Sequence, residues 1–136
     1  MKISRCLLII ILTFNNVKGQ SNQECLNNLS IFAESAKIKN YDAAYDNWLL
    51  VLNECPKLNL AIYTYGEKIL KHKIKNSSGD IKSAFKKDLI SLYDKWVQNI
   101  PSRKGVSRVG NILSTKAQAL IAVSYTHLTL PTTPYV

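Results

Sequence analysis

Two cysteines are the residues of this chain best placed to do covalent chemistry. Cys25 lies at the start of a predicted helix, Glu24–Lys37, and Cys55 lies just after the next predicted helix, Tyr41–Asn53. A very short connection makes two such helices antiparallel, so these two ends meet. We expect a disulfide, which would close a loop of about 30 residues and stabilise the fold by roughly 3–4 kcal/mol. The alternative is a pair of buried free thiols that pack as small apolar groups.

No other arrangement of reactive side chains points to catalysis. His72 is the only histidine before the C-terminal tail, and it stands between two lysines, where we expect it to be exposed. One histidine with two distant cysteines is not a zinc pattern, and the segment from Gly105 to Gly110 lacks the spacing of a phosphate-binding loop. We therefore expect no catalytic residue, no metal, no cofactor and no small-molecule substrate, and a protein that is not an enzyme.

Lysine is concentrated in one part of the chain. The net charge is +9, yet residues 20–56 hold five acidic side chains against two lysines, so the basic excess lies further along. The lysines that could form a partner-binding surface are Lys68, Lys71, Lys75, Lys82 and Lys86. They could face an acidic protein, an anionic polysaccharide or a membrane surface, and the alternative is a solvated helix face. Nucleic acid is disfavoured by the expected export and by the lack of an aromatic base-stacking platform.

Residues 1–19 have the pattern of a secretory signal peptide. Lys2 and Arg5 supply the positive start, residues 6–14 are apolar, and a cleavage point precedes Gln20. The apolar run is shorter than the roughly 20 residues that span a bilayer. The alternatives are a buried N-terminal helix and an uncleaved anchor. We expect cleavage and export to the periplasm, the cell surface or the medium, where disulfides persist.

The C-terminal residues 123–136 differ in character from the rest. The stretch 123–132 reads VSYTHLTLPT, which resembles the conceptual translation of a transposon-end sequencing adapter. The alternative is a threonine-rich strand with alternating side chains. We expect 123–136 to be an artefactual, disordered tail without function, and 20–122 to be one truncated helical domain.

Apolar residues recur at three- and four-residue steps between these ends, which predicts an all-α fold without strands. Besides the two helices named above, helices are expected over 59–75, 81–98 and 106–122. Asn40 is expected to take the left-handed conformation that ends the first helix, and Asp80 to cap the fourth. The residues expected to face inward include Leu26, Ile81 and Ala84.

Two further expectations concern exposed side chains. Tyr63 falls off the apolar stripe of its helix and could line a concave groove. The last helix lacks a partner, so its apolar residues would be exposed or would fold back. These residues are Val109, Ile112, Leu113 and Leu120.

Large and small residues between Glu24 and Lys75 are spaced in a way that resembles the tetratricopeptide repeat, a unit of about 34 residues with two antiparallel helices. The positions that the resemblance assigns to packing between helices are Tyr41, Ala44, Trp48, Val51, Pro56, Tyr65, Gly66 and Ile69. The chain departs from the repeat at Phe32, where glycine is usual, and in the long helix 81–98. The resemblance implies antiparallel hairpins stacked as a short solenoid, and the alternative is a generic amphipathic bundle.

The segments ECLNNLSIFAESAK and KNYDAAY also look like the start of exported repeat proteins from Bacteroidetes bacteria. This resemblance implies a non-catalytic scaffold that binds a peptide or a partner protein. One alternative is the docking arm of a larger envelope enzyme whose catalytic domain lies outside this sequence. The other is a structural helical bundle of the envelope.

Overall fold

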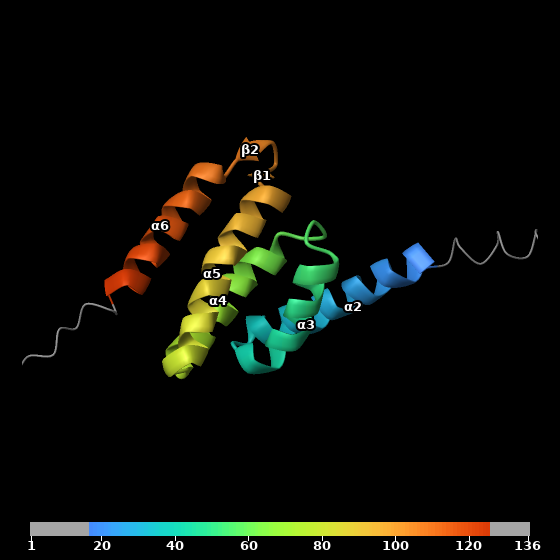
Figure 1. The fold of residues 1–136 in the computed structure, drawn as a ribbon. Coiled ribbons are helices and arrows are strands. Elements are labelled where there is room, and N and C mark those ends of the chain that lie inside the picture. The colour runs from blue at the N-terminus through green and yellow to red at the C-terminus, as the bar shows by residue number, and fades with distance from the viewer. Residues whose placement is uncertain (1–16, 126–136) are drawn as a thin grey trace, which may run out of the picture. The chain divides into compact units, whose positions relative to one another are not determined.

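The computed structural model describes residues 17–125, and this part of the chain is all-α apart from one pair of two-residue strands (Figure 1). The elements are α2 (Val17–Lys37), α3 (Tyr41–Glu54), α4 (Ala61–Asn76), α5 (Gly79–Asn99), β1 (Ser102–Arg103), β2 (Val106–Ser107) and α6 (Val109–Tyr125). The predicted all-α fold class is confirmed. Most of the expected signal peptide and most of the expected tail lie outside the described residues.

The chain divides into two compact units, and the boundary falls between Ile62 and Tyr63 in the first turn of α4. The first unit holds α2 and α3. The second holds the rest of α4, together with α5, the strand pair and α6. The expectation for 20–122 was a single domain.

Helices α2 and α3 form an antiparallel hairpin, and the turn between them is built on Lys39. This residue has a φ of 64°, in the left-handed region that follows many helix ends. The amide of Asn40 donates to the carbonyl oxygen of Ser35 at 2.9 Å, and the amide of Lys39 donates to the carbonyl oxygen of Ala36 at 3.1 Å. These two bonds define a Schellman motif. The left-handed residue is therefore Lys39 and not the predicted Asn40.

Asn40 has a different task, because it caps the start of α3. Its side-chain oxygen accepts a hydrogen bond from the amide of Ala43 at 3.3 Å. Such a bond satisfies one of the amides that have no partner within the first turn of a helix. One pair of residues thus ends α2 and begins α3, and this keeps the connection short enough to make the helices antiparallel.

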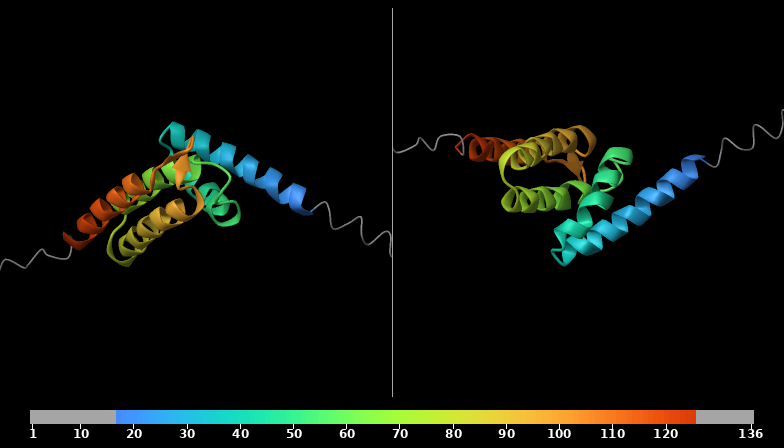
Figure 2. Two further views of the ribbon diagram at one scale, coloured as in Figure 1. Left: turned by 90° about the horizontal axis from the view of Figure 1, so that it is seen from above. Right: turned by 60° about the horizontal axis from the view of Figure 1, so that its bottom comes forward.

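In the second unit, α4 and α5 run antiparallel beside each other (Figures 1 and 2). The ring of Tyr63 stacks on that of Trp96 with centroids 5.6 Å apart. Ser77 and Ser78 alone separate the two helices. The N-cap position of α5 is Ser78 and not the predicted Asp80, and the Ser78 side chain makes no capping hydrogen bond. The helix begins at Gly79, whose φ is 57°.

A two-residue turn leads from α5 into α6. Ser102 pairs with Ser107 and Arg103 with Val106 in an antiparallel register, and Lys104 and Gly105 between them have φ values of 52° and 76°. Two successive positive φ values are the signature of a type I′ hairpin turn. The expectation of no strand is wrong here, because two-residue strands are too short for an alternating pattern to be visible.

Helix α6 packs along α5 through the buried Ile112 and through an ion pair between Lys116 and Asp94. Val106 and Ser107 are used by the strand pair, so the helix starts at Val109 and not at the predicted Val106. The predicted apolar stripe is exposed only in part. Leu113 and Leu120 are exposed, whereas Ile112 is buried and Val109 is half-buried.

Three residues expected to face inward are exposed: Leu26, Ile81 and Ala84. The stacking of Tyr63 on Trp96 fixes the antiparallel register, which puts Ile81 beyond Asn76, the last residue of α4. Ala84 lies level with that end. In the first hairpin Leu26 lies opposite Glu54, the last residue of α3. Helix periodicity predicts which face is apolar, but it does not predict where the neighbouring helix stops.

Candidate functional site

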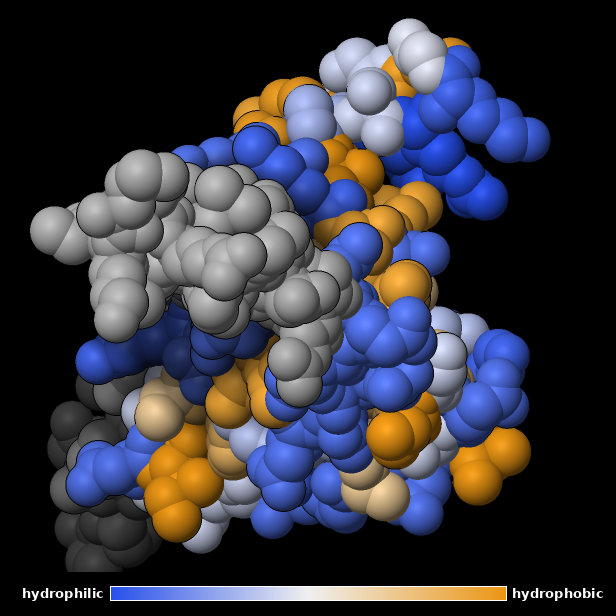
Figure 3. All heavy atoms as spheres, turned by 90° about the vertical axis from the view of Figure 1, so that its right-hand side faces the viewer, coloured by the Kyte–Doolittle hydropathy of each residue, from blue (hydrophilic) through white to orange (hydrophobic). Residues whose placement is uncertain are grey.

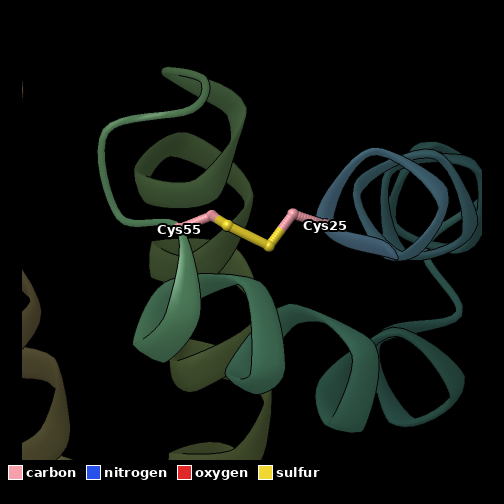
Figure 4. The surroundings of a disulfide bond; sticks show 2 residues. All are labelled: Cys25 and Cys55. Carbon is pink, nitrogen blue, oxygen red and sulfur yellow. A yellow bond between two sulfur atoms is a disulfide. The ribbon is translucent and has the colours of Figure 1, made fainter. Parts of the chain in front are cut away.

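The disulfide between Cys25 and Cys55 joins the open ends of the first hairpin (Figure 4). Their Cα atoms are 6.3 Å apart, within the range that a disulfide requires. The Cys25 side chain is buried, with 2% of its surface exposed, and Cys55 is half-buried. The predicted pairing is confirmed, and the alternative of two free thiols is wrong.

An open hollow of about 270 Å³ lies beside this disulfide and was not predicted. It is lined by Glu24, Cys25, Leu50 and Glu54. Glu24 and Cys25 come from α2, and Leu50 and Glu54 come from the C-terminal part of α3. Its two carboxylates are exposed, and its apolar lining is small, so the hollow offers little that would hold a specific ligand.

The buried core of the first hairpin centres on Trp48. The side chains of Ala44, Trp48 and Val51 have at most 1% of their surface exposed. The indole N–H of Trp48 donates to the carbonyl oxygen of Ile62 at 2.7 Å, so this large side chain is buried without an unsatisfied donor. These are the positions that the repeat resemblance assigns to a small, a large and a second small residue.

The other repeat-packing positions are less uniform. Gly66 and Ile69 are buried in α4, whereas Tyr41, Pro56 and Tyr65 are half-buried. The ring of Tyr65 lies 5.5 Å from the ammonium of Lys68, an exposed cation–π contact. The predicted groove residue Tyr63 is fully buried, so the expectation that it lines a groove is wrong.

The five lysines of the predicted partner surface all lie on α4 and α5. Lys68, Lys71 and Lys75 are exposed and Lys82 and Lys86 are half-buried. Lys71 pairs with Glu67 one turn earlier at 2.6 Å. Residues 63–125 hold twelve basic side chains against four acidic ones. The lysines are therefore gathered in one unit, at the end where α4 turns into α5.

Tyr93 of α5 has a raised pKa, to which Glu67 of α4 contributes. Burial raises the pKa of the Tyr93 hydroxyl, and the nearby Glu67 carboxylate raises it further because ionisation would place two negative charges together. Burial also raises the pKa of Tyr63, against the opposing effect of a hydrogen bond with Asn99. Both tyrosines are therefore held neutral, as part of the packing between the helices.

Two buried polar atoms on α5 have no hydrogen-bond partner of ordinary geometry within residues 17–125. They are the hydroxyl oxygen of Tyr93 and the indole nitrogen of Trp96. The Glu67 carboxylate is close enough to Tyr93 to act on its charge but does not complete a standard bond. A buried donor without a partner costs roughly 1–3 kcal/mol, so these atoms weaken the second unit.

His72 is half-buried, not exposed as predicted, and its ring lies 3.0 Å from the side-chain nitrogen of Asn76. Within the described residues no group of three or more His, Cys, Asp or Glu side chains could hold a metal ion. None of the helices from α2 to α6 is both long enough and apolar enough to cross a membrane.

Apolar residues reach the surface at several places among hydrophilic ones (Figure 3). The most exposed large apolar side chains are Ile38, Val106, Ile81 and Ile121. They come from different helices and turns, which is normal for a protein surface.

Comparison with protein-family models, with curated proteins and with solved structures finds no match for this chain. The repeat resemblance therefore rests on the residues themselves.

Proposed function

We propose that this protein is an exported, non-catalytic helical-repeat scaffold that binds a peptide or a partner protein. The observation that carries the proposal is the disulfide-closed hairpin of α2 and α3, which buries the small–large–small set Ala44, Trp48 and Val51. A second antiparallel pair, α4 and α5, follows it directly in the chain. Helical hairpins repeated along a chain generate extended surfaces that bind proteins.

Export is supported by the disulfide and by the signal-like sequence. Disulfides persist in oxidising compartments and are rare in reducing ones. The periplasm or the cell surface would meet that requirement, and the residues 1–19 would direct the chain there.

The proposal is tested by capture of envelope proteins on the full oxidised chain. We expect one or a few proteins to be retained and to bind in a saturable manner. The control bait is the same chain reduced and alkylated at Cys25 and Cys55, which loses the tie across the first hairpin. No saturable binding to any protein would overturn the proposal, whereas equal retention by both baits would show that the partner does not bind through the disulfide-tied hairpin.

A further inference from the structure

The hollow beside the disulfide places two carboxylates next to the Cys25–Cys55 bond. Glu24 and Glu54 line it together with Cys25. Each of these glutamates also immediately precedes one of the two cysteines in the sequence. Both glutamates are exposed, and the bond joins α2 to the residue that follows α3 (Figure 4). A reagent that enters the hollow to reach the disulfide therefore comes close to both negative charges.

Positive charge is scarce around this bond. Lys57 is the one basic residue within four positions of either cysteine in the sequence, and it does not line the hollow. The other basic side chains of residues 20–62 are Lys37 and Lys39, which lie at the opposite end of the hairpin, where α2 ends and α3 begins. The lining of the hollow is therefore negatively charged.

Reduction of a disulfide begins when a thiolate attacks one of its sulfur atoms. A bond forms between the attacking sulfur and one cysteine Sγ, the Cys25–Cys55 S–S bond breaks, and the other Sγ leaves as a thiolate. A second thiolate of the reagent then attacks the mixed disulfide, which oxidises the reagent to its own disulfide and leaves both cysteines reduced. The attacking and leaving sulfur atoms carry negative charge, so carboxylates beside the bond oppose each step.

We propose that Glu24 and Glu54 form an electrostatic barrier that slows reduction of the Cys25–Cys55 disulfide by anionic thiols more than by cationic ones. The disfavoured class is typified by glutathione, whose thiolate also carries an excess of carboxylates. The favoured class has a positive charge beside its thiol, as in cysteamine. The two carboxylates lie at the surface, so the barrier weakens as salt is added. It acts on the reactivity of the bond, whether or not the chain is a scaffold.

The test follows reduction of the full oxidised chain, with Cys6 alkylated beforehand, by an excess of glutathione, mercaptoethanol or cysteamine. Samples are quenched with iodoacetamide, and mass spectrometry measures the fraction labelled at Cys25 and Cys55. For each thiol the rate for Glu24→Gln/Glu54→Gln is divided by the rate for the wild type, which cancels the intrinsic reactivity of the thiol. At about 0.1 M salt we expect a ratio of roughly 2–5 for glutathione, a smaller ratio for mercaptoethanol and the ratio nearest to 1 for cysteamine. At about 1 M salt the three ratios should converge.

The matched control is Glu34→Gln/Asp46→Asn, which removes the same charge from the same two helices. Glu34 lies nine residues after Cys25 and Asp46 lies nine residues before Cys55, which is roughly 13–14 Å along each helix axis and beyond the Debye length of about 10 Å at 0.1 M salt. The glutathione ratio of this control should be close to 1. Equal ratios for the three thiols would mean that Glu24→Gln/Glu54→Gln only loosens the hairpin, and equal ratios for the two double variants would leave only an effect of net charge. Either result would overturn the electrostatic barrier.

Discussion

Single residues set the geometry of the first hairpin, and Lys39 is the clearest case. A lysine in the left-handed region is strained, because its Cβ approaches the backbone, whereas glycine has no Cβ. Residue preferences alone predict the neighbouring Asn40 for this position. It is used instead as a cap, since its short side chain reaches the amide of Ala43.

We expect Lys39→Gly to raise the free energy of unfolding by about 1 kcal/mol, because the strain is relieved while the Schellman bonds remain. Urea denaturation followed by circular dichroism would measure this. Lys39→Ala is the control, since it removes the charge and keeps the strained φ. A Lys39→Gly variant no more stable than Lys39→Ala would contradict the assignment of Lys39 to the left-handed position.

The hydroxyl of Tyr93 gives a second prediction at this scale. Tyr93→Phe removes a buried oxygen that has no standard hydrogen bond, so we expect stability at neutral pH to be unchanged or raised by up to about 1 kcal/mol. A loss above about 1 kcal/mol in urea denaturation would show that the hydroxyl is well bonded.

The raised pKa of Tyr93 also predicts a dependence on pH. Its folded pKa lies above the unfolded value of about 10, so the stabilisation is complete below that pH and is lost as the pH rises through the folded value. The stability of Tyr93→Phe relative to the wild type should therefore increase between pH 8 and about 11. A constant difference across this range would contradict the raised pKa.

At the scale of elements, the sequence predicts the helices better than it predicts their surroundings. Helix α3 is predicted over Tyr41–Asn53 and runs over Tyr41–Glu54. Its bounds are predictable because the signals that start and stop it, the polar Lys39–Asn40 pair and Pro56, lie next to it in the sequence. The disulfide was also predictable, because a short turn brings the ends of a hairpin together.

What could not be read from the sequence depends on distant residues. Tyr63 is off the apolar stripe of α4, yet it is buried because Trp96 stacks on it from another helix. Ile81 is on the apolar stripe of α5, yet it is exposed because α4 has already ended.

The disulfide carries the prediction that belongs to the element scale. It closes a separation of 30 residues, and the loop-entropy relation then gives a stabilisation of about 3–4 kcal/mol. Cys25→Ala/Cys55→Ala should lose about this much in urea denaturation, and a reductant should have the same effect on the wild type only. A loss below about 1 kcal/mol would mean that the hairpin is held by its packing without help from the bridge.

At the scale of the whole molecule, charge divides between the two units. Residues 20–62 carry five acidic and three basic side chains, whereas residues 63–125 carry four acidic and twelve basic ones. A field of one sign over one unit speeds encounter with a partner of opposite sign and depends on ionic strength. In the proposed scaffold we therefore place partner binding in the second unit, and the disulfide ties the hairpin of the first unit.

The central claim, that the chain is a protein-binding scaffold, is tested most directly by calorimetric titration of the purified captured partner into the full oxidised chain. We predict a saturable isotherm with a fixed stoichiometry, and an affinity that falls as salt is raised because the lysines lie at the interface. Heat that never saturates, or an affinity unchanged by reduction of the disulfide and by salt together, would contradict it.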